Sequence, residues 1–331
     1  MTISESLKFA AAKLNAGCID IPHLEAEILL SKTLKKSREF ILTHGERKLA
    51  KFQIANYKLL IKKRLKRIPV AYLTNEKEFY GLKFKVNKSV LIPRPETELI
   101  VEEALTLATH CSQLATRNSQ PATRNPQLAT RNSLLVAHNP QPVTLIDVGT
   151  GSGCIIIALA KQLLTRHKIQ NIKYKLFGID ISKKALIVAK QNAKIHNVNK
   201  KIKFIIGNLL EPIINNPKYK IQNTKYIILA NLPYLTQTQI KNSPTIKHEP
   251  NLALSGGKNG LRLYKKLFEQ INYLIQKYKI HDSLFILCEF DPRQTGKIKQ
   301  LIKRELPGAN CQIKKDLFGL NRLVIIKIPS V

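Results

Sequence analysis

A glycine-rich turn between a predicted strand and a predicted helix is the first place in this sequence where residue types and spacing could do chemistry. Residues 147–153 read Asp-Val-Gly-Thr-Gly-Ser-Gly and lie between apolar stretches at 143–148 and 154–164. Glycines permit a tight turn and let a ligand approach backbone N–H groups at a helix N-terminus. The turn lacks both the G-x-G-x-x-G spacing of dinucleotide sites and the Lys-Ser/Thr ending of a phosphate-binding loop. We therefore expect a ligand without a pyrophosphate.

An acidic residue at the end of the next predicted strand strengthens this expectation. Asp180 follows Gly149 by 31 residues, and a carboxylate at that position can accept both hydroxyl groups of a ribose. Glycine turns also occur for packing alone, but the combination of strand, turn, helix and acid favours binding. An adenosine-containing cofactor that lacks a pyrophosphate fits best, which points to S-adenosyl-L-methionine.

A second candidate site is the tetrapeptide Asn231-Leu232-Pro233-Tyr234, which follows the predicted strand 226–230. Residues just past the carboxyl ends of strands face the ligand crevice in open α/β sheets. An amide side chain and neighbouring backbone carbonyls can hold a planar NH₂ group with its nitrogen toward a sulfonium methyl, and orientation supplies much of the rate for a poor nucleophile. Tyr234 can pack on a flat amide or base. An ordinary turn is the plain alternative, but the position favours catalysis.

The elements that must position these residues alternate between strand and helix from residue 143 onward. Near-continuous apolar strands such as 226–230 are typical of a sheet covered on both faces, and the last two strands, with no helix between them, predict an antiparallel edge hairpin. The fold class is α/β, with a doubly wound, mostly parallel seven-stranded sheet. The predicted strands are 143–148, 174–179, 202–206, 226–230, 284–288, 312–315 and 323–328, and the helices are 154–164, 183–196, 260–279 and 293–306.

The N-terminal region is predicted to be a small all-helical domain. Thr2 and Glu5 form a capping-box pattern that opens a first helix, and Pro22 marks the first turn of a second. A third helix covers 52–67. Its candidate inward positions are Ile54, Leu59, Ile61 and Leu65.

Changes in composition divide the chain into four parts. Residues 1–75 form the helical domain, and 76–103 form a strand-and-loop connector that contains the segment IPRPETE. Residues 104–142 contain no acidic residue and carry the seven-residue repeats QLATRNS, QPATRNP and QLATRNS, which predicts a disordered insertion. The cofactor-binding catalytic domain is then 143–331.

The composition limits the class of protein but does not identify a binding partner. The net charge is +33, but most of the basic residues are lysine, so a compositional bias competes with nonspecific affinity for RNA or ribosomes. Five cysteines without a CxxC pair and eight histidines without an i, i+4 pair predict no metal site and a reducing compartment. No secretion signal and no apolar stretch of 18 residues is present, so we expect a cytoplasmic protein that does not bind a membrane.

Six stretches of the sequence resemble the release-factor glutamine N5-methyltransferases, a family of class I S-adenosylmethionine-dependent enzymes. The resemblance covers nearly the whole chain outside 104–142, and the segments IPRPETE and EPNLALSGGKNGL are the ones that narrow it to this family. The matching stretches are EKEFYGLKFKVNKSVLIPRPETE, DVGTGSGCIIIALA, the GIDIS segment at 178–193, NLPY, HEPNLALSGGKNGLRLY and KDLFGLNRLV.

This resemblance implies a function and roles for individual residues. It implies methyl transfer to the side-chain amide of the glutamine in the Gly-Gly-Gln tripeptide of peptide chain release factors, with the helical domain docking the release factor and the loop around Arg94 and Glu96 near the active site. Asn231, with Leu232, Pro233 and Tyr234, would bind the substrate amide. The implied cofactor-binding residues are Asp147, Gly149, Thr150, Gly151, Gly153, Asp180, Asn208, Leu209 and Asn231.

The chain departs from the usual residues of the family at three positions. Leu232 stands where the first proline of N-P-P-Y is expected, Asn208 replaces the common aspartate after the third strand, and Asp291 follows Glu289 and Phe290 where the family has glycine. Two other functions stay open at this point. One is methylation of an adenine amino group in nucleic acid, which uses the same tetrapeptide, and the other is a cofactor-binding RNA- or ribosome-associated module with weakened turnover.

Overall fold

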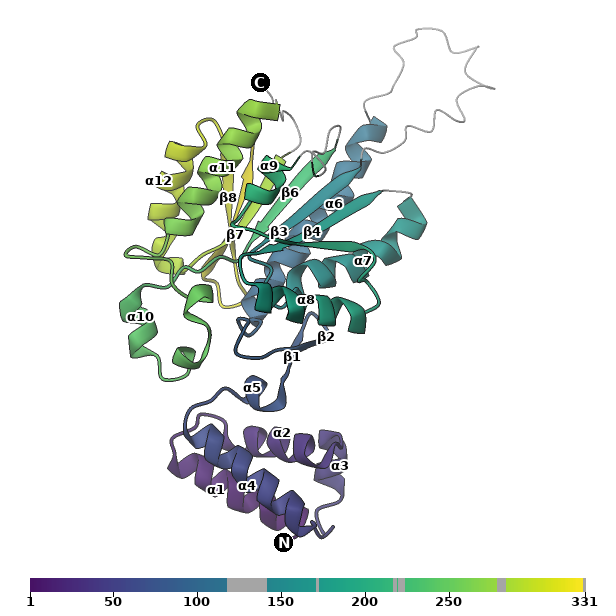
Figure 1. Cartoon of the computed structure of the whole chain (residues 1–331), viewed down its shortest axis with the longest axis vertical. Helices are drawn as coiled ribbons and strands as arrows, with labels where there is room; N and C mark the ends of the chain where they lie inside the picture. Colours follow the sequence, from purple (N-terminus) through teal and green to yellow (C-terminus); the bar gives the residue numbers. More distant parts are fainter. Residues whose placement is uncertain (118–141, 171–172, 217–218, 220–223, 279–283, 330–331) are drawn as a thin grey trace.

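The computed structural model describes residues 1–117, 142–170, 173–216, 219, 224–278 and 284–329. These residues form a small helical unit at the N-terminus and a larger α/β unit above it (Figure 1). Most of the predicted insertion, including the repeats from residue 118 onward, lies outside the described residues.

The helical unit has its own hydrophobic core. The predicted capping box is confirmed, because Thr2 accepts from the Glu5 backbone N–H and the Glu5 side chain accepts from the Thr2 backbone N–H. The core is built by Ile3, Leu14, Leu29 and other residues of the first four helices. The helices are α1 (Ile3–Ala16), α2 (Pro22–Leu34), α3 (Arg38–Thr43), α4 (Lys51–Leu65) and α5 (Val70–Thr74).

The inward face of α4 differs from the prediction. Leu59 and Leu65 are exposed, whereas Tyr57 and Arg64 are buried. Arg64 donates to both carboxylate oxygens of Glu25 on α2, at 2.6 and 3.0 Å, and this bidentate ion pair turns a basic residue toward the core. The predicted inward position Ile61 is buried, as expected.

Part of the predicted insertion is helix. The connector forms a hairpin of β1 (Glu76–Phe79) and β2 (Leu82–Lys85), and α6 begins at Glu98 and continues to Arg117. The disordered insertion predicted to start at residue 104 is therefore wrong over 104–117. A stripe of apolar residues at helical spacing explains the difference, because it packs α6 against the main sheet. The buried residues of this stripe are Ile100, Val101, Ala104, Leu105 and Ala108.

The α/β unit is built on the predicted seven-stranded sheet, whose order is β5-β4-β3-β6-β7-β9-β8. Strands β5, β4, β3, β6 and β7 run parallel, whereas β9 pairs antiparallel with β7 and with β8. The predicted α/β class and the antiparallel edge hairpin are both confirmed. The strands are β3 (Val143–Val148), β4 (Tyr174–Asp180), β5 (Ile202–Ile206), β6 (Lys225–Ala230), β7 (Leu284–Glu289), β8 (Asn310–Lys315) and β9 (Asn321–Lys327).

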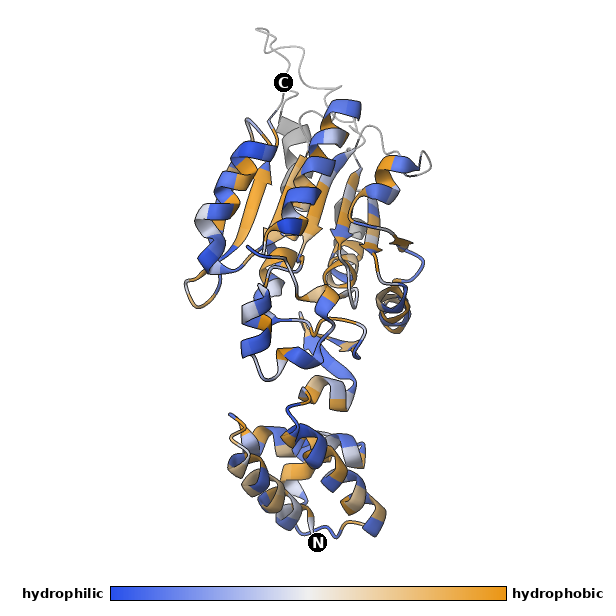
Figure 2. Ribbon diagram, turned by 60° about the vertical axis from the view of Figure 1, so that its left-hand side comes forward, coloured by the Kyte–Doolittle hydropathy of each residue, from blue (hydrophilic) through white to orange (hydrophobic). Residues whose placement is uncertain are grey.

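Helices cover both faces of this sheet, and its strands are the most hydrophobic part of the unit (Figure 2). One face packs against α6, α7 (Cys154–Gln170) and α8 (Lys183–Ile195), and the other packs against α9 (Glu211–Asn215), α11 (Arg262–Tyr278) and α12 (Thr295–Glu305). Successive residues of β3 point to opposite faces: Leu145 packs in the core with α6 and α7, and Ile146 packs in the core with α11 and α12. The parallel strands therefore end together at one edge, where loops can form a site.

Candidate active site

A cavity of about 1050 Å³ opens at the carboxyl ends of β3, β4, β5 and β6. Its walls combine the glycine turn after β3 with the loops after the next parallel strands and with segments 88–97 and 250–255. Nine of the predicted site residues line it together, although they lie at or just after the ends of four separate strands. They are Gly149, Thr150, Gly151, Asp180, Asn208, Leu209, Asn231, Leu232 and Pro233.

Asp180 fixes the glycine turn through a hydrogen bond to its backbone. Each carboxylate oxygen of Asp180 accepts one backbone N–H, from Gly151 and from Ser182, both at 2.8 Å. Gly149 and Gly151 have φ values of +75° and +55°, a region that favours glycine. Burial raises the pKa of Asp180 above its ordinary value. The carboxylate lies at the cavity wall, where its remaining lone pairs can accept the hydroxyl groups of a ligand.

Two predicted cofactor residues lie behind the turn and do not line the cavity. Asp147 is fully buried and accepts from the Thr150 hydroxyl at 2.6 Å, and burial raises its pKa to about 7. Gly153 packs against α7 and α8: a Cβ there would lie 2.8 Å from the Ile157 side chain and 3.2 Å from the Ala189 side chain. Both residues therefore support the shape of the turn.

The loop after β5 supplies an amide and an apolar side chain to the same cavity. Asn208 donates from its NH₂ group to Glu211 at 3.1 Å, which leaves its side-chain oxygen as an acceptor. Leu209 has a φ of +56°, a left-handed conformation that costs a non-glycine residue about 1–2 kcal/mol. Strained positions of this kind gather at ligand sites, and here the strained residue lines the cavity wall.

Asn231 presents the clearest chemical arrangement in the cavity. Its NH₂ group donates to Glu289 at 3.1 Å and to Thr97 at 2.9 Å. One oxygen of Glu289 accepts from Asn231 and the other accepts from the Tyr234 hydroxyl, so the Glu289 side chain fixes the direction of the amide. The side-chain oxygen of Asn231 is then the atom that can accept hydrogen bonds from a ligand. Glu289 is 1% exposed, and burial raises its pKa above the ordinary value.

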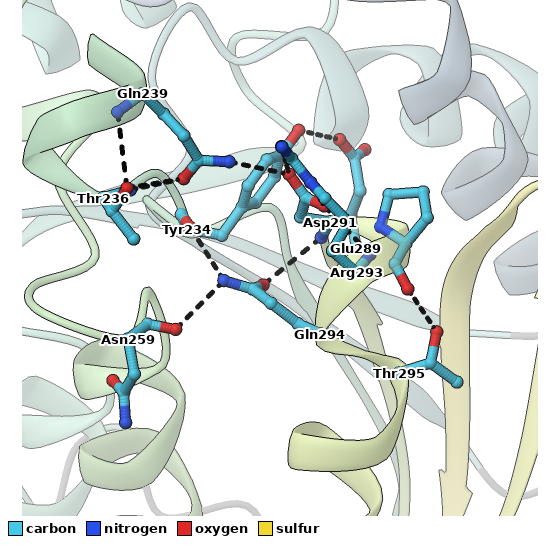
Figure 3. A network of polar contacts seen from close by, with 10 residues as sticks. Tyr234, Thr236, Gln239, Asn259, Glu289, Asp291, Arg293, Gln294 and Thr295 are labelled. Atoms are coloured by element: carbon cyan, nitrogen blue, oxygen red, sulfur yellow. Dashed lines mark hydrogen bonds and ion pairs between the residues drawn. The ribbon is translucent and has the colours of Figure 1, made fainter. Parts of the chain in front are cut away.

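Tyr234 does not line the cavity, unlike the other three residues of its tetrapeptide. Its hydroxyl donates to the second oxygen of Glu289 at 3.1 Å, so the phenol helps to orient that carboxylate (Figure 3). Burial raises the pKa of the Tyr234 hydroxyl, which keeps it protonated as a donor. The contact between Tyr234 and a flat substrate group stays a prediction.

A wider network fixes the loop that contains Tyr234 (Figure 3). The Gln294 side chain donates to the backbone oxygens of Tyr234 and Asn259, at 2.9 and 3.2 Å. Asp291 accepts from Gln239 on α10 (Gln237–Asn242) at 3.2 Å and from Arg293 at 2.5 Å. The aspartate that replaces a family glycine thus links α10 to the segment after β7.

The two segments that narrowed the family resemblance meet at the cavity. Glu249 accepts from the Ile92 backbone N–H at 3.0 Å and pairs with the Arg94 side chain, which lines the cavity. A basic residue expected near the site is therefore held in place by a buried carboxylate from a segment far along the chain.

Three functional residues escaped the sequence analysis, namely Glu289, Thr97 and Gln294. Each reaches the site through a partner at least 55 residues away in the sequence. Only the position of Glu289 at the end of an apolar strand could have indicated it. Among the described residues no group of three or more His, Cys, Asp or Glu residues could hold a metal ion, and in the same part of the chain no helix is long and apolar enough to cross a bilayer.

Comparison with known proteins places this fold in a family. Residues 5–74 match a family model described as the PrmC N-terminal domain, and residues 141–312 match one described as a methyltransferase domain. The release factor glutamine methyltransferase of Bacillus subtilis (strain 168) is 30% identical over 325 residues, which cover 98% of this chain and 96% of that protein. This chain belongs to the release factor glutamine methyltransferase family.

A second relative of this release factor glutamine methyltransferase family member also matches over most of its length. The protein of that name from Thermodesulfovibrio yellowstonii is 31% identical over 306 residues, covering 92% of this chain and 91% of that protein. A solved structure of the hMettl16 catalytic domain with a MAT2A 3'UTR hairpin is 14% identical, with a TM-score of 0.49 over 80% of this chain and 82% of that chain. The family model and the curated relatives show that the protein is a methyltransferase, and its catalytic unit is the mostly parallel seven-stranded sheet described above.

Proposed function

We propose that this methyltransferase transfers the methyl group of S-adenosyl-L-methionine to the side-chain amide nitrogen of the glutamine in the Gly-Gly-Gln tripeptide of peptide chain release factors. The observation that carries the proposal is the fixed amide of Asn231, whose oxygen is left to accept from a ligand. An acceptor at this point suits a substrate that offers N–H bonds. The names of the relatives supply the release factor and its glutamine.

The residues of the cavity fit the proposed cofactor. Asp180 offers lone pairs to a ribose diol, and the positive φ values of Gly149 and Gly151 bring bare backbone to the wall where the methionine part would lie. The side-chain oxygen of Asn208 can accept from the amino group of adenine, and the Leu209 side chain can pack against the adenine ring. When bound, the cofactor supplies a methyl group on a positively charged sulfur.

The chain's own part in the reaction is to orient a weak nucleophile. The Asn231 side-chain oxygen and the backbone oxygens of Leu232 and Pro233 would accept the two N–H bonds of the substrate amide and hold its nitrogen toward the methyl group. The amide becomes far more acidic once methylated, so its proton can leave afterwards and no general base is needed before transfer. Tyr234 and Glu289 act by holding Asn231 in this orientation.

The helical unit is the proposed docking site for the release factor. Its support is the match of residues 5–74 to the PrmC N-terminal domain. The net charge of +33 would add an attraction to acidic partners that weakens as salt is raised, and this attraction extends to RNA and ribosomes without sequence preference.

Transfer of a labelled methyl group tests the proposal. The protein is incubated with labelled S-adenosyl-L-methionine and a release factor, its Gln→Ala variant in the tripeptide, bulk RNA or DNA. We expect label only in the unaltered release factor. Label in nucleic acid would overturn the proposal in favour of an adenine methyltransferase. Cofactor binding without label in any acceptor would overturn it in favour of a binding module.

A further inference from the structure

Asn192 on α8 is a fully buried polar side chain outside the cavity. Its side-chain oxygen accepts from the Lys85 backbone N–H at 2.8 Å. Its NH₂ group donates to the backbone oxygens of Lys85 and Ser152, at 3.0 and 2.8 Å. Lys85 ends β2 and Ser152 belongs to the glycine turn. One amide thus joins α8 to two segments that are far apart in the sequence.

The bonds of Asn192 to β2 resemble those of a neighbouring strand. Val86 donates to Asn75 beside β1 at 3.2 Å, so the backbone groups of Lys85 point to the other edge of β2, where α8 lies. The Asn192 amide pairs with both of these groups and keeps its second N–H for Ser152. Leucine has a similar shape but would leave all three backbone groups without this partner, which is unfavourable for groups shielded from water. Packing alone therefore does not explain an asparagine at this position.

The segments that Asn192 joins form one wall of the cavity. Ser152 lines the cavity, as do Ala185 near the start of α8 and the segment 88–91 that follows β2. Val90 of that segment packs in one small core with Ala185. Asp180 and Ser182 line the same part of the cavity, where the ribose of the cofactor is proposed to lie. A shift of the turn relative to β2 would therefore change the shape of the cofactor site.

We infer that Asn192 is a positioning residue for the cofactor, which it serves by holding the glycine turn and the end of β2 at a fixed separation. This inference deepens the proposed function and rests on it for the identity of the cofactor. Asn192 acts through the backbones of Ser152 and Lys85. Cofactor binding should therefore also restrain the β1–β2 hairpin, although the hairpin does not line the cavity.

A split between cofactor binding and turnover tests the inference. Asn192→Leu should raise the calorimetric Kd for S-adenosyl-L-methionine about tenfold, the effect of buried hydrogen bonds lost behind the site, and leave the kcat at saturating cofactor within about threefold. A merely structural role would give a different result, because a loss of folded protein lowers the number of binding sites and the kcat together and leaves the Kd unchanged. An unchanged Kd in the folded variant would overturn the inference.

His196→Ala is the matched control. His196 lies four residues after Asn192 and also reaches β2, since its Nε2 atom is 2.9 Å from the Lys83 backbone oxygen. This bond joins α8 to β2 alone, so its loss should leave the cofactor Kd within about twofold of wild type. Equal rises of the Kd in both variants would overturn the inference, because the attachment of β2 to α8 would then matter and the bridge to the glycine turn would not.

Hydrogen exchange in wild type tests the same bridge without relying on a variant that folds. Saturating S-adenosyl-L-methionine should slow exchange at the Lys85 amide at least about threefold, because Asn192 ties this N–H to a turn that the ligand holds, and it should leave the Ile61 amide in α4 unchanged. An unchanged rate at Lys85 in the cofactor-bound protein would overturn the inference. Slower exchange at Lys85 in a protein that methylates no release factor would support it and count against the proposed substrate alone.

Discussion

At the two ends of the cavity, an asparagine is oriented by a glutamate in the same way, but the two glutamates differ in burial. At each end an asparagine gives its NH₂ group to a glutamate and keeps its oxygen for a ligand: Asn231 with Glu289 and Asn208 with Glu211. Glu289 is buried and holds a second donor, Tyr234. The side chain of Glu211 is 42% exposed and pairs with Lys266.

Because of this difference in burial, the Asn231 oxygen is a rigid acceptor and the Asn208 oxygen is an adjustable one. The loss of a buried hydrogen bond that leaves a polar atom without a partner costs about 1–3 kcal/mol. An exposed pair contributes about 0–1 kcal/mol and weakens with salt. The end proposed to orient the substrate nitrogen has the more rigid hydrogen bonds, whereas the end proposed for adenine needs only to bind.

The largest expected effect follows from removing the acceptor at the rigid end. Asn231→Ala should lower kcat at least about 100-fold, because the substrate nitrogen loses its orientation. The cofactor Kd should stay within about threefold of wild type. Steady-state methyl transfer and calorimetric cofactor binding measure the two quantities.

Asn208→Ala is the matched control for this prediction, since it removes the same side chain from the other end. It should raise the cofactor Kd several-fold and leave the kcat at saturating cofactor within about threefold. Equal loss of binding and turnover in both variants would mean that the two ends do not divide their roles.

The next effect is expected at the carboxylate that fixes Asn231. Glu289→Gln keeps the shape of the side chain but offers an amide that can face Asn231 with either its oxygen or its NH₂ group. We expect kcat to fall about 10- to 100-fold, as for the loss of one buried hydrogen bond that leaves its donor without a partner, with little change in the cofactor Kd. A kcat equal to that of wild type would show that Asn231 keeps its orientation without the carboxylate.

The elements that could be predicted are those whose signal is local. The apolar run 143–148 and its glycine turn gave β3 with its observed bounds, and strand ends placed Asp180 and Asn231 at one edge. The predicted start of the insertion was wrong because the prediction relied on the absence of acidic residues. It gave too little weight to the apolar residues at helical spacing, such as Ala104 and Ala108, which are buried in α6.

Features that depend on distant partners escaped prediction. Arg64 has the sequence environment of a surface residue, and only its pairing with Glu25, 39 residues away, turns it inward. Thr97 reaches Asn231 across 134 residues. Gly153 matches the ligand-binding pattern of its turn, but its φ of +82° and the close approach of Ala189 on α8 also require a glycine there. Pattern and spacing within one segment carry no information about such contacts.

The buried carboxyl of Asp147, at the end of β3 between the two asparagine loops, gives a test that depends on pH. Because burial raises the pKa of Asp147 from 3.8 to about 7, the folded chain binds more protons than the unfolded chain between these values. This group therefore makes the free energy of unfolding fall as pH rises from about 4 to 7, by at most about 1.4 kcal/mol per pH unit. Asp147→Asn should remove this slope, so its stability relative to wild type should increase across that window in denaturant titrations.

Thr150→Val is the control for the titration of Asp147. It removes the hydroxyl that donates to the carboxylate and lowers its pKa, but it keeps the titrating group. The loss of stability with rising pH should therefore persist in this variant and extend to higher pH. If Asp147→Asn and wild type show the same dependence on pH, the carboxyl is not titrating in the folded chain in this range.

The smallest expected effect lies at the exposed glutamate. Glu211→Gln should raise the cofactor Kd by at most about threefold, because solvent can replace the bonds that Glu211 makes to Asn208 and Lys266 at 3.1 and 2.9 Å. Raising the salt from about 0.05 to 0.5 M should remove even this difference, whereas the loss of kcat in Glu289→Gln should persist, since screening acts weakly on buried groups. A loss in Glu211→Gln that is large and insensitive to salt would show that both asparagines are held rigidly, and the division between an orienting end and a binding end would fail.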